Sequence, residues 1–170
     1  MVDDVNTLID LQGIDDNRLL LDLPQTPQGW EAMIRSLAAQ AWSLPMLLLG
    51  VGQPIGVAAI GLTNLRSRNS YLLSLFATPA QSRVPLALYI RHLFWNFPLT
   101  RLYVHIPAVS ELEPYLDLHQ GVGFRLEGSL RQHTLIGGVR HDVTVLGLLR
   151  EEFESWCQLH EKRLSLAQGN

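Results

Sequence analysis

Two side chains that can move protons, Tyr115 and His119, stand four residues apart in the sequence. Residues 110–119 have a helical pattern, and this spacing places both side chains on one face of that helix. An imidazole with a pKa of about 6.5 can act as an acid or a base close to neutral pH. A histidine in the last turn of a helix also stabilises the helix dipole without any catalysis. The pair is therefore a candidate acid–base site, with a purely structural role as the alternative.

A second group of polar side chains precedes the most apolar helical pattern of the chain. Gln81, Ser82 and Arg83 come directly before this pattern, which runs from Val84 to Phe97. Hydroxyl and guanidinium groups are good donors to phosphate oxygens, and the free backbone amides at a helix N-terminus also bind anions. These residues indicate an anion site. The alternative is a packed helix start without a ligand, since Pro85 is compatible with the first turn of a helix.

Length and composition favour a single folded domain over residues 1–170. The chain is 47% hydrophobic and 17% charged, whereas disordered chains have the opposite balance. A net charge of −3 gives no reason to expect a nucleic-acid partner. The basic side chains between residues 125 and 141 are interpreted as a solvated hairpin face, with a polyanion site as the alternative.

The sequence also indicates where the protein resides. The single cysteine, Cys157, excludes an internal disulfide and suits a reducing compartment. No signal-peptide pattern follows Met1, and the most apolar window, Pro85–Leu99, is too short to span a bilayer. We expect a cytoplasmic protein with no membrane partner.

The order of the predicted elements is typical of an α+β fold with a mixed central sheet. A helix is expected from Pro27 to Ala41, after two short apolar runs. Strands are expected at Pro45–Val51, Ile55–Leu62 and Tyr71–Phe76, and short turns between them favour antiparallel pairing. The helix Val84–Phe97 and the strand Leu102–Ile106 then complete a βαβ unit, whose two strands should be parallel.

The last third of the chain predicts a helix, a hairpin and a closing helix. Ser110 and Glu113 have the spacing of a capping box for the helix Ser110–His119. Two strand-like runs, Arg125–Thr134 and Asp142–Leu149, are joined by a segment that contains Gly137-Gly138, which is a hairpin signal. An amphipathic helix follows at 151–162. The four tryptophans of the chain are dispersed and are interpreted as core residues: Trp30, Trp42, Trp95 and Trp156.

The region from Gly121 to Glu152 resembles the C-terminal part of the GNAT superfamily of acyl-CoA-dependent N-acyltransferases. The resemblance rests on an ordered set of residues: Gly123-Phe124, Glu127-Gly128, Leu130-Arg131, Asp142 and Leu148 to Glu152. Within that superfamily the chain looks most similar to the ribosomal-protein N-terminal acetyltransferases, also because of its Pro54-Ile55-Gly56-Val57-Ala58 segment. The predicted elements follow the GNAT order from about Trp30 to Glu152.

The resemblance implies an acetyl-CoA or other acyl-CoA cofactor and particular roles for these residues. The strand end at Leu75, Phe76 and Ala77 would bind the thioester and the amide arm of the cofactor. The segment Gln81-Ser82-Arg83-Val84 would bind its pyrophosphate, and Tyr115 or His119 would protonate the leaving sulfur. The chain departs from the family where glycines are expected, because Val84, Pro85 and Leu86 give a degenerate pyrophosphate loop. An asparagine is also absent after the strand that ends at Ile106.

We therefore expect a transferase that moves an acetyl or related acyl group to a primary amine, on a peptide N-terminus or a small molecule. The alternative is a catalytically degenerate GNAT-like domain that acts as a protein-binding or assembly module. A homodimer is also expected as a possibility, since edge strands of this fold often pair between subunits. No metal-ligand spacing is found in the sequence.

Overall fold

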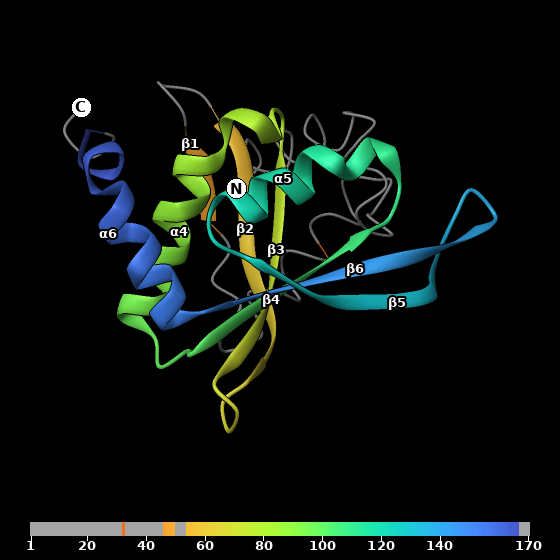
Figure 1. The fold of residues 1–170 in the computed structure, drawn as a ribbon, viewed down its shortest axis with the longest axis horizontal. Coiled ribbons are helices and arrows are strands. Elements are labelled where there is room, and N and C mark those ends of the chain that lie inside the picture. Colours follow the sequence, from red (N-terminus) through yellow and green to blue (C-terminus); the bar gives the residue numbers. More distant parts are fainter. Residues whose placement is uncertain (1–31, 33–45, 50–53, 167–170) are drawn as a thin grey trace.

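The computed structural model describes residues 32, 46–49 and 54–166 (Figure 1). The elements, in chain order, are β1 (Met46–Leu49), β2 (Pro54–Asn64), β3 (Asn69–Phe76), the 3₁₀ turn η1 (Pro79–Gln81), α4 (Arg83–Asn96), β4 (Arg101–Pro107), the 3₁₀ turn η2 (Ser110–Leu112), α5 (Glu113–Gly121), β5 (Arg125–Ile136), β6 (Val139–Leu149) and α6 (Arg150–Leu166). The predicted helix Pro27–Ala41, the two apolar runs before it, Trp30 and Trp42 lie outside the described residues.

The described strands form one six-stranded sheet in the order β1-β2-β3-β4-β6-β5. The β3–β4 pair is parallel, and every other neighbouring pair is antiparallel. The helix α4 makes the crossover between β3 and β4 (Figure 1). The predicted mixed sheet, its βαβ unit and its C-terminal hairpin are therefore confirmed.

The parallel pair β3–β4 is joined along only part of its length. Asn69, Ser70 and Tyr71 pair with Arg101, Leu102 and Tyr103, although β3 continues to Phe76 and β4 to Pro107. The two strands separate beyond these pairs, and a gap opens within the sheet. The backbone groups of β3 that face this gap need partners other than a strand.

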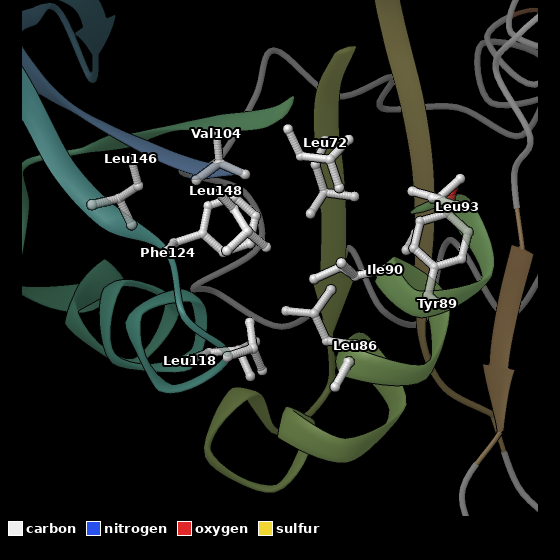
Figure 2. Packing of buried hydrophobic residues seen from close by; sticks show 14 of the residues in the cluster. Leu72, Leu86, Tyr89, Ile90, Leu93, Val104, Leu118, Phe124, Leu146 and Leu148 are labelled. Carbon is white, nitrogen blue, oxygen red and sulfur yellow. The ribbon is translucent and has the colours of Figure 1, made fainter. Parts of the chain in front are cut away.

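The core lies on the face of the sheet that α4 and α5 cover together. In Figure 2, Leu72, Val104 and Leu146 of the sheet point toward Ile90 of α4 and Leu118 of α5. Burial alternates along β3 and β4, so that Leu72, Ser74, Leu102, Val104 and Ile106 are buried and the residues between them are mostly half-buried. The side chains of Tyr71, Tyr103 and His105 therefore lie on the opposite face of the sheet.

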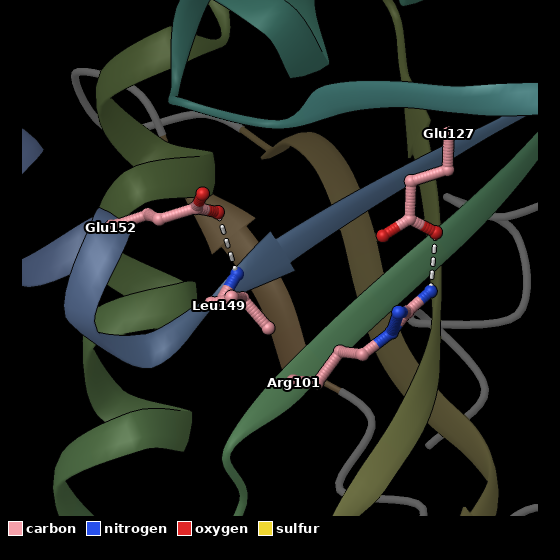
Figure 3. Close-up of polar contacts among 4 residues, drawn as sticks. All are labelled: Arg101, Glu127, Leu149 and Glu152. Atoms are coloured by element: carbon pink, nitrogen blue, oxygen red, sulfur yellow. Dashed lines mark hydrogen bonds and ion pairs between the residues drawn. The ribbon is translucent and has the colours of Figure 1, made fainter.

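The β5–β6 hairpin extends away from the body of the sheet (Figure 1). Gly137 and Gly138 form its two-residue turn with φ values of 56° and 81°, which is the backbone geometry that favours Gly-Gly in such turns. The hairpin predicted from these glycines is confirmed. At its base, Arg101 of β4 forms an ion pair with Glu127 of β5, and Glu152 accepts a hydrogen bond from the amide of Leu149 (Figure 3).

Two sequence predictions about the helices are wrong. The hydroxyl of Ser110 bonds the carboxylate of Glu111, and η2 separates it from α5, whose N-cap residue Leu112 has no side-chain cap bond. The predicted capping box is therefore absent, because the chain makes a 3₁₀ turn before the helix begins. Trp95 is 68% exposed and not a core residue, since it lies on the outer face of α4. Trp156 does pack against the core.

None of the helices in the described part of the chain has the length and apolar character needed to cross a membrane.

Two glycines of β2 differ in the space around them and provide a test of how β3 packs. A Cβ at Gly56 would collide with the ring of Phe76 and the carbonyl of Leu75, whereas one at Gly61 would meet no atom within 4 Å. We expect Gly56→Ala to lower the free energy of unfolding by about 1–3 kcal/mol through overpacking. Gly61→Ala, the matched control, should change it by about 0.5 kcal/mol or less. Urea unfolding of both variants measures this, and equal effects would contradict the described packing.

Candidate functional site

The gap between β3 and β4 is occupied by a hydroxyl from α5. The amide of Phe76 donates to the Tyr115 hydroxyl oxygen over 2.7 Å, and that hydroxyl donates to the Phe76 carbonyl over 3.1 Å. Tyr115 is fully buried. One side chain therefore bonds both backbone groups of Phe76, beyond the last residues of β3 that pair with β4.

His119 lies one helical turn farther along α5 and reaches the same strand. Its Nδ1 is 2.7 Å from the carbonyl oxygen of Tyr115, and its Nε2 is 3.2 Å from the Ser74 hydroxyl. A carbonyl only accepts, so we infer that Nδ1 carries the proton and that Nε2 accepts from Ser74. His119 is 2% exposed. Burial lowers the pKa of His119 to about 4, so the imidazole is neutral at pH 7.

Side chains from both faces of the sheet line the gap. Ser74, Tyr115 and His119 reach it from the helix-covered face, and Tyr71 and His105 reach it from the other face. The cavity that remains between them is about 20 Å³, which is room for about one water molecule. The gap is thus a position in the sheet where groups on opposite faces approach each other.

The polar segment before α4 lies near the C-terminal end of α5. Ser82 is buried and its hydroxyl donates to the carbonyl of Thr78 over 2.8 Å. The hydroxyl proton is therefore engaged within the protein and does not face a ligand. Gln81 and Arg83 are exposed. The guanidinium of Arg83 occupies the place where a Cβ of Gly121 would stand. Within the described residues, Arg83 forms no ion pair.

The first turn of α4 keeps part of its capacity to bind an anion. The amides of Arg83 and Val84 have no intrahelical acceptor, since they lie in the first turn, whereas Pro85 has no amide to offer. The Leu86 side chain is fully buried in the core, and Val84 packs against the same core. The side chains that replace the expected glycines therefore point at least partly inward.

The structure brings some of the predicted site residues together and not others. Phe76, Tyr115 and His119 meet at the gap, as described above. Ala77 donates its amide to Ile55 of β2 over 2.9 Å, so this backbone group faces away from the gap. Leu75 is fully buried, and Gln81 to Val84 form a separate region at the start of α4. The predicted roles of these residues stay predictions.

The sequence analysis did not single out Ser74 or Tyr71. Alternation along β3 could have placed Ser74 among buried leucines, which is a signal that a buried hydroxyl needs a partner. No comparable pattern in the sequence indicates where β3 and β4 separate. Among the described residues, no group of three or more potential ligands could hold a metal ion.

Comparisons with known proteins match structures but not sequences. No family model and no curated protein matches the chain. A chimera of the spermidine N-acetyltransferase SpeG from Vibrio cholerae and hSSAT superposes with a TM-score of 0.76 at 16% identity, over 91% of this chain and 96% of that one. A point mutant of Vibrio cholerae SpeG gives 0.74 at 17% identity, over 90% and 94% of the two chains.

The chain has the GNAT acetyltransferase fold. A third structure, assigned only in general terms as an acetyltransferase, supports this with a TM-score of 0.76 at 17% identity, over 96% of this chain and 90% of that one. At identities this low, the superpositions demonstrate the GNAT fold but not a branch within it. The similarity to the ribosomal-protein acetyltransferases therefore stays a prediction.

The neutral, buried state of His119 makes stability depend on pH. In the unfolded chain this imidazole titrates near its ordinary value of 6.5, and in the native protein at about 4. The unfolded state therefore binds more protons in this range, and native stability falls as the pH falls from 6.5 toward 4. The loss due to this group is on the order of 3 kcal/mol.

We expect His119→Gln to remove this contribution. Urea unfolding at pH 7 and pH 5 should show a smaller difference in unfolding free energy for the variant than for the wild type. If the variant does not fold, the imidazole signals of the native wild type decide instead. A His119 signal that titrates near 6.5 would contradict the buried, neutral state.

Proposed function

We propose that the protein is an acyl-CoA-dependent N-acyltransferase that moves an acetyl or related acyl group to a primary amine. The observation that carries this proposal is the gap between β3 and β4, with α4 and α5 on one face of the sheet beside it. In this gap the amide and carbonyl of Phe76 are bonded by a side-chain hydroxyl and not by β4. Two side chains that carry protons, Tyr115 and His119, lie beside the gap. The N-terminus of α4 follows the end of β3 in the chain.

Residues at the start of α4 and at the gap fit a coenzyme A thioester in three respects. The exposed guanidinium of Arg83 and the free amides of Arg83 and Val84 are suited to a pyrophosphate. Leu86 is buried in the core, so its side chain does not cover the outer side of the first turn. The Tyr115 hydroxyl bonds the backbone amide and carbonyl of Phe76, and an amide of the cofactor arm can take the place of that hydroxyl. The thioester would supply the activated acyl group.

Proton transfer in this proposal uses Tyr115. The amine nitrogen forms a bond to the acyl carbon while the carbon–sulfur bond breaks; the nitrogen loses one proton and the departing sulfur gains one. The hydroxyl of Tyr115 is the proton donor near the strand end. His119 is neutral and its Nε2 accepts from the Ser74 hydroxyl, so it positions that hydroxyl and is a poor proton donor at neutral pH.

The acceptor is proposed as a small amine or a peptide N-terminus. The structural similarity to spermidine N-acetyltransferases supports the small amine, and the resemblance to the ribosomal-protein branch supports the peptide. A homodimer is a further part of the proposal. Among the described strands β5 lies at one edge of the sheet and is exposed along most of its length, so a second copy could pair with that edge.

The alternative function is that of a protein-binding module. Its support is the exposed Trp95, which lies under the guanidinium of Arg91 at 5.0 Å beside a groove of about 400 Å³ between α4 and α6. An exposed aromatic side chain next to a groove is typical of an interaction surface. A protein that does not bind acyl-CoA would make this the function to pursue.

Calorimetric titration with acetyl-CoA tests the proposal, and Arg83 provides the sharpest variant. We expect saturable binding by the wild type and a Kd about tenfold higher for Arg83→Ala. Such a loss corresponds to about 1.4 kcal/mol, the low end for hydrogen bonds to charged groups. Arg66→Ala, which removes another exposed arginine in the β2–β3 turn, is the control and should bind as the wild type does.

Two outcomes of this titration would contradict the proposal. Absence of heat and of a thermal shift at millimolar acetyl-CoA would exclude the enzyme. Equal weakening by Arg83→Ala and Arg66→Ala would mean that binding depends on overall charge and not on the start of α4.

A further inference from the structure

Gly121, the last residue of α5, faces the guanidinium of Arg83 at the start of α4. A Cβ at Gly121 would collide first with three atoms of that guanidinium, Nε, Cζ and Nη2, and with all three to nearly the same extent. The flat face of the guanidinium therefore covers Gly121, and its N–H groups, which lie in the plane, point past the glycine. Within the described residues, no hydrogen bond or ion pair engages these N–H groups.

The backbone of Gly121 does not itself require a glycine. Gly121 belongs to α5, and its φ is not positive, unlike that of Gly123. Inside a helix alanine is more favourable than glycine. The space that Arg83 occupies is therefore the feature of the structure with which an alanine at this position would conflict.

The end of α5 is fixed more firmly than the side chain that lies against it. The indole Nε1 of Trp156, a residue that packs against the core, donates to the carbonyl of Gly121 over 3.1 Å. The amide of Phe124 donates to the carbonyl of His119 over 3.1 Å. Arg83 is exposed, and its guanidinium is the far end of a flexible side chain. A Cβ at Gly121 would therefore displace the guanidinium and not the helix end.

We propose that Gly121 is a positioning residue for Arg83, and that this pair makes the protein select acyl donors with a phosphate-bearing arm. The inference rests on the proposed function, in which Arg83 binds the pyrophosphate of the donor. A guanidinium binds phosphate oxygens through the N–H groups in its plane, and these are the groups that the contact with Gly121 leaves free. The contact also orders a flexible side chain before the donor arrives, which lowers the entropic cost of binding.

The two parts of the donor are recognised at separate places. The thioester and the amide arm reach the gap beside Phe76 and Tyr115, whereas the phosphates reach Arg83. A donor without phosphates, such as S-acetylpantetheine, uses the first place only. Displacement of Arg83 therefore weakens the binding of acetyl-CoA and leaves the binding of S-acetylpantetheine unchanged.

The contact between the two residues is tested by NMR of the protein without a ligand. We expect Gly121→Ala to shift the Nε–H signal of Arg83, which is assigned by its loss in Arg83→Ala. The melting temperature should be unchanged or slightly higher, because alanine favours the helix. Gly61→Ala is the matched control, since a Cβ there meets no atom within 4 Å, and it should leave the signal in place. An unshifted Arg83 signal in Gly121→Ala would overturn the contact.

The positioning role is tested by calorimetric titration of a double-mutant cycle. We expect Gly121→Ala to raise the Kd for acetyl-CoA by up to about tenfold, the effect expected for Arg83→Ala. The double variant should bind acetyl-CoA no more weakly than Arg83→Ala alone, since both changes remove the same interaction. S-acetylpantetheine should have the same Kd for the wild type and all three variants. Equal weakening of both donors by Gly121→Ala would overturn the selection of phosphate-bearing donors.

Failure of this inference can be told apart from failure of the proposed function. Wild-type affinity of Gly121→Ala for acetyl-CoA, together with weaker binding by Arg83→Ala, would mean that the contact serves stability alone. That result, or additive losses in the double variant, would overturn the role of Gly121 and leave the acyltransferase intact. Absence of acetyl-CoA binding by the wild type would instead refute the acyltransferase and with it the selection of donors.

Discussion

The double hydrogen bond between the Tyr115 hydroxyl and the backbone of Phe76 is the interaction on which the site depends. Buried amides and carbonyls need partners, and β4 stops supplying them after Tyr71 pairs with Tyr103. Tyr115 donates one bond and accepts another, and it thereby stabilises the end of β3 apart from its neighbour. Without it, we expect the two strands either to close or to leave unsatisfied polar groups in the core.

The position of Tyr115 in turn depends on how α5 packs and ends. The helix lies on the same face as α4, and Leu112 and Leu118 bury its inner side. His119 joins it to β3 through Ser74, and Gly123, with a φ of 102°, directs the chain from the helix into β5. The buried side of α5, the bond from His119 to Ser74 and the turn at Gly123 thus hold the Tyr115 hydroxyl at the end of β3. In the same arrangement, side chains from both faces of the sheet line one cavity of about 20 Å³.

The sequence predicted those parts of the fold that local chemistry decides. The hairpin follows from Gly137-Gly138, the helix end from the glycines after His119, and the parallel pair from one crossover helix. The capping box failed because Ser110 found a nearer partner in Glu111. The prediction that Trp95 is a core residue was wrong because the sequence of an almost wholly apolar helix does not indicate which side faces solvent.

The candidate site was predicted only in part, for a different reason. The spacing of Tyr115 and His119 placed them on one helix face, but their partners, Phe76 and Ser74, are about forty residues away in sequence. The separation of β3 from β4 depends on such long-range contacts, and no local sequence pattern in either strand indicates it. The approach of His133 to His105, at 6.2 Å between ring centroids, was not predicted because the two residues become neighbours only through the pairing of β4 and β5 with β6.

The central claim is that the gap between β3 and β4 receives a ligand arm from the helix-covered face. The most direct measurement is amide NMR of the ¹⁵N-labelled protein with and without desulfo-CoA, which lacks the reactive sulfur. We predict saturable changes at Ser74, Phe76 and the first amides of α4, together with slower hydrogen exchange at the end of β3. Changes confined to the outer face of α4 around Trp95, or none at saturating ligand, would contradict it.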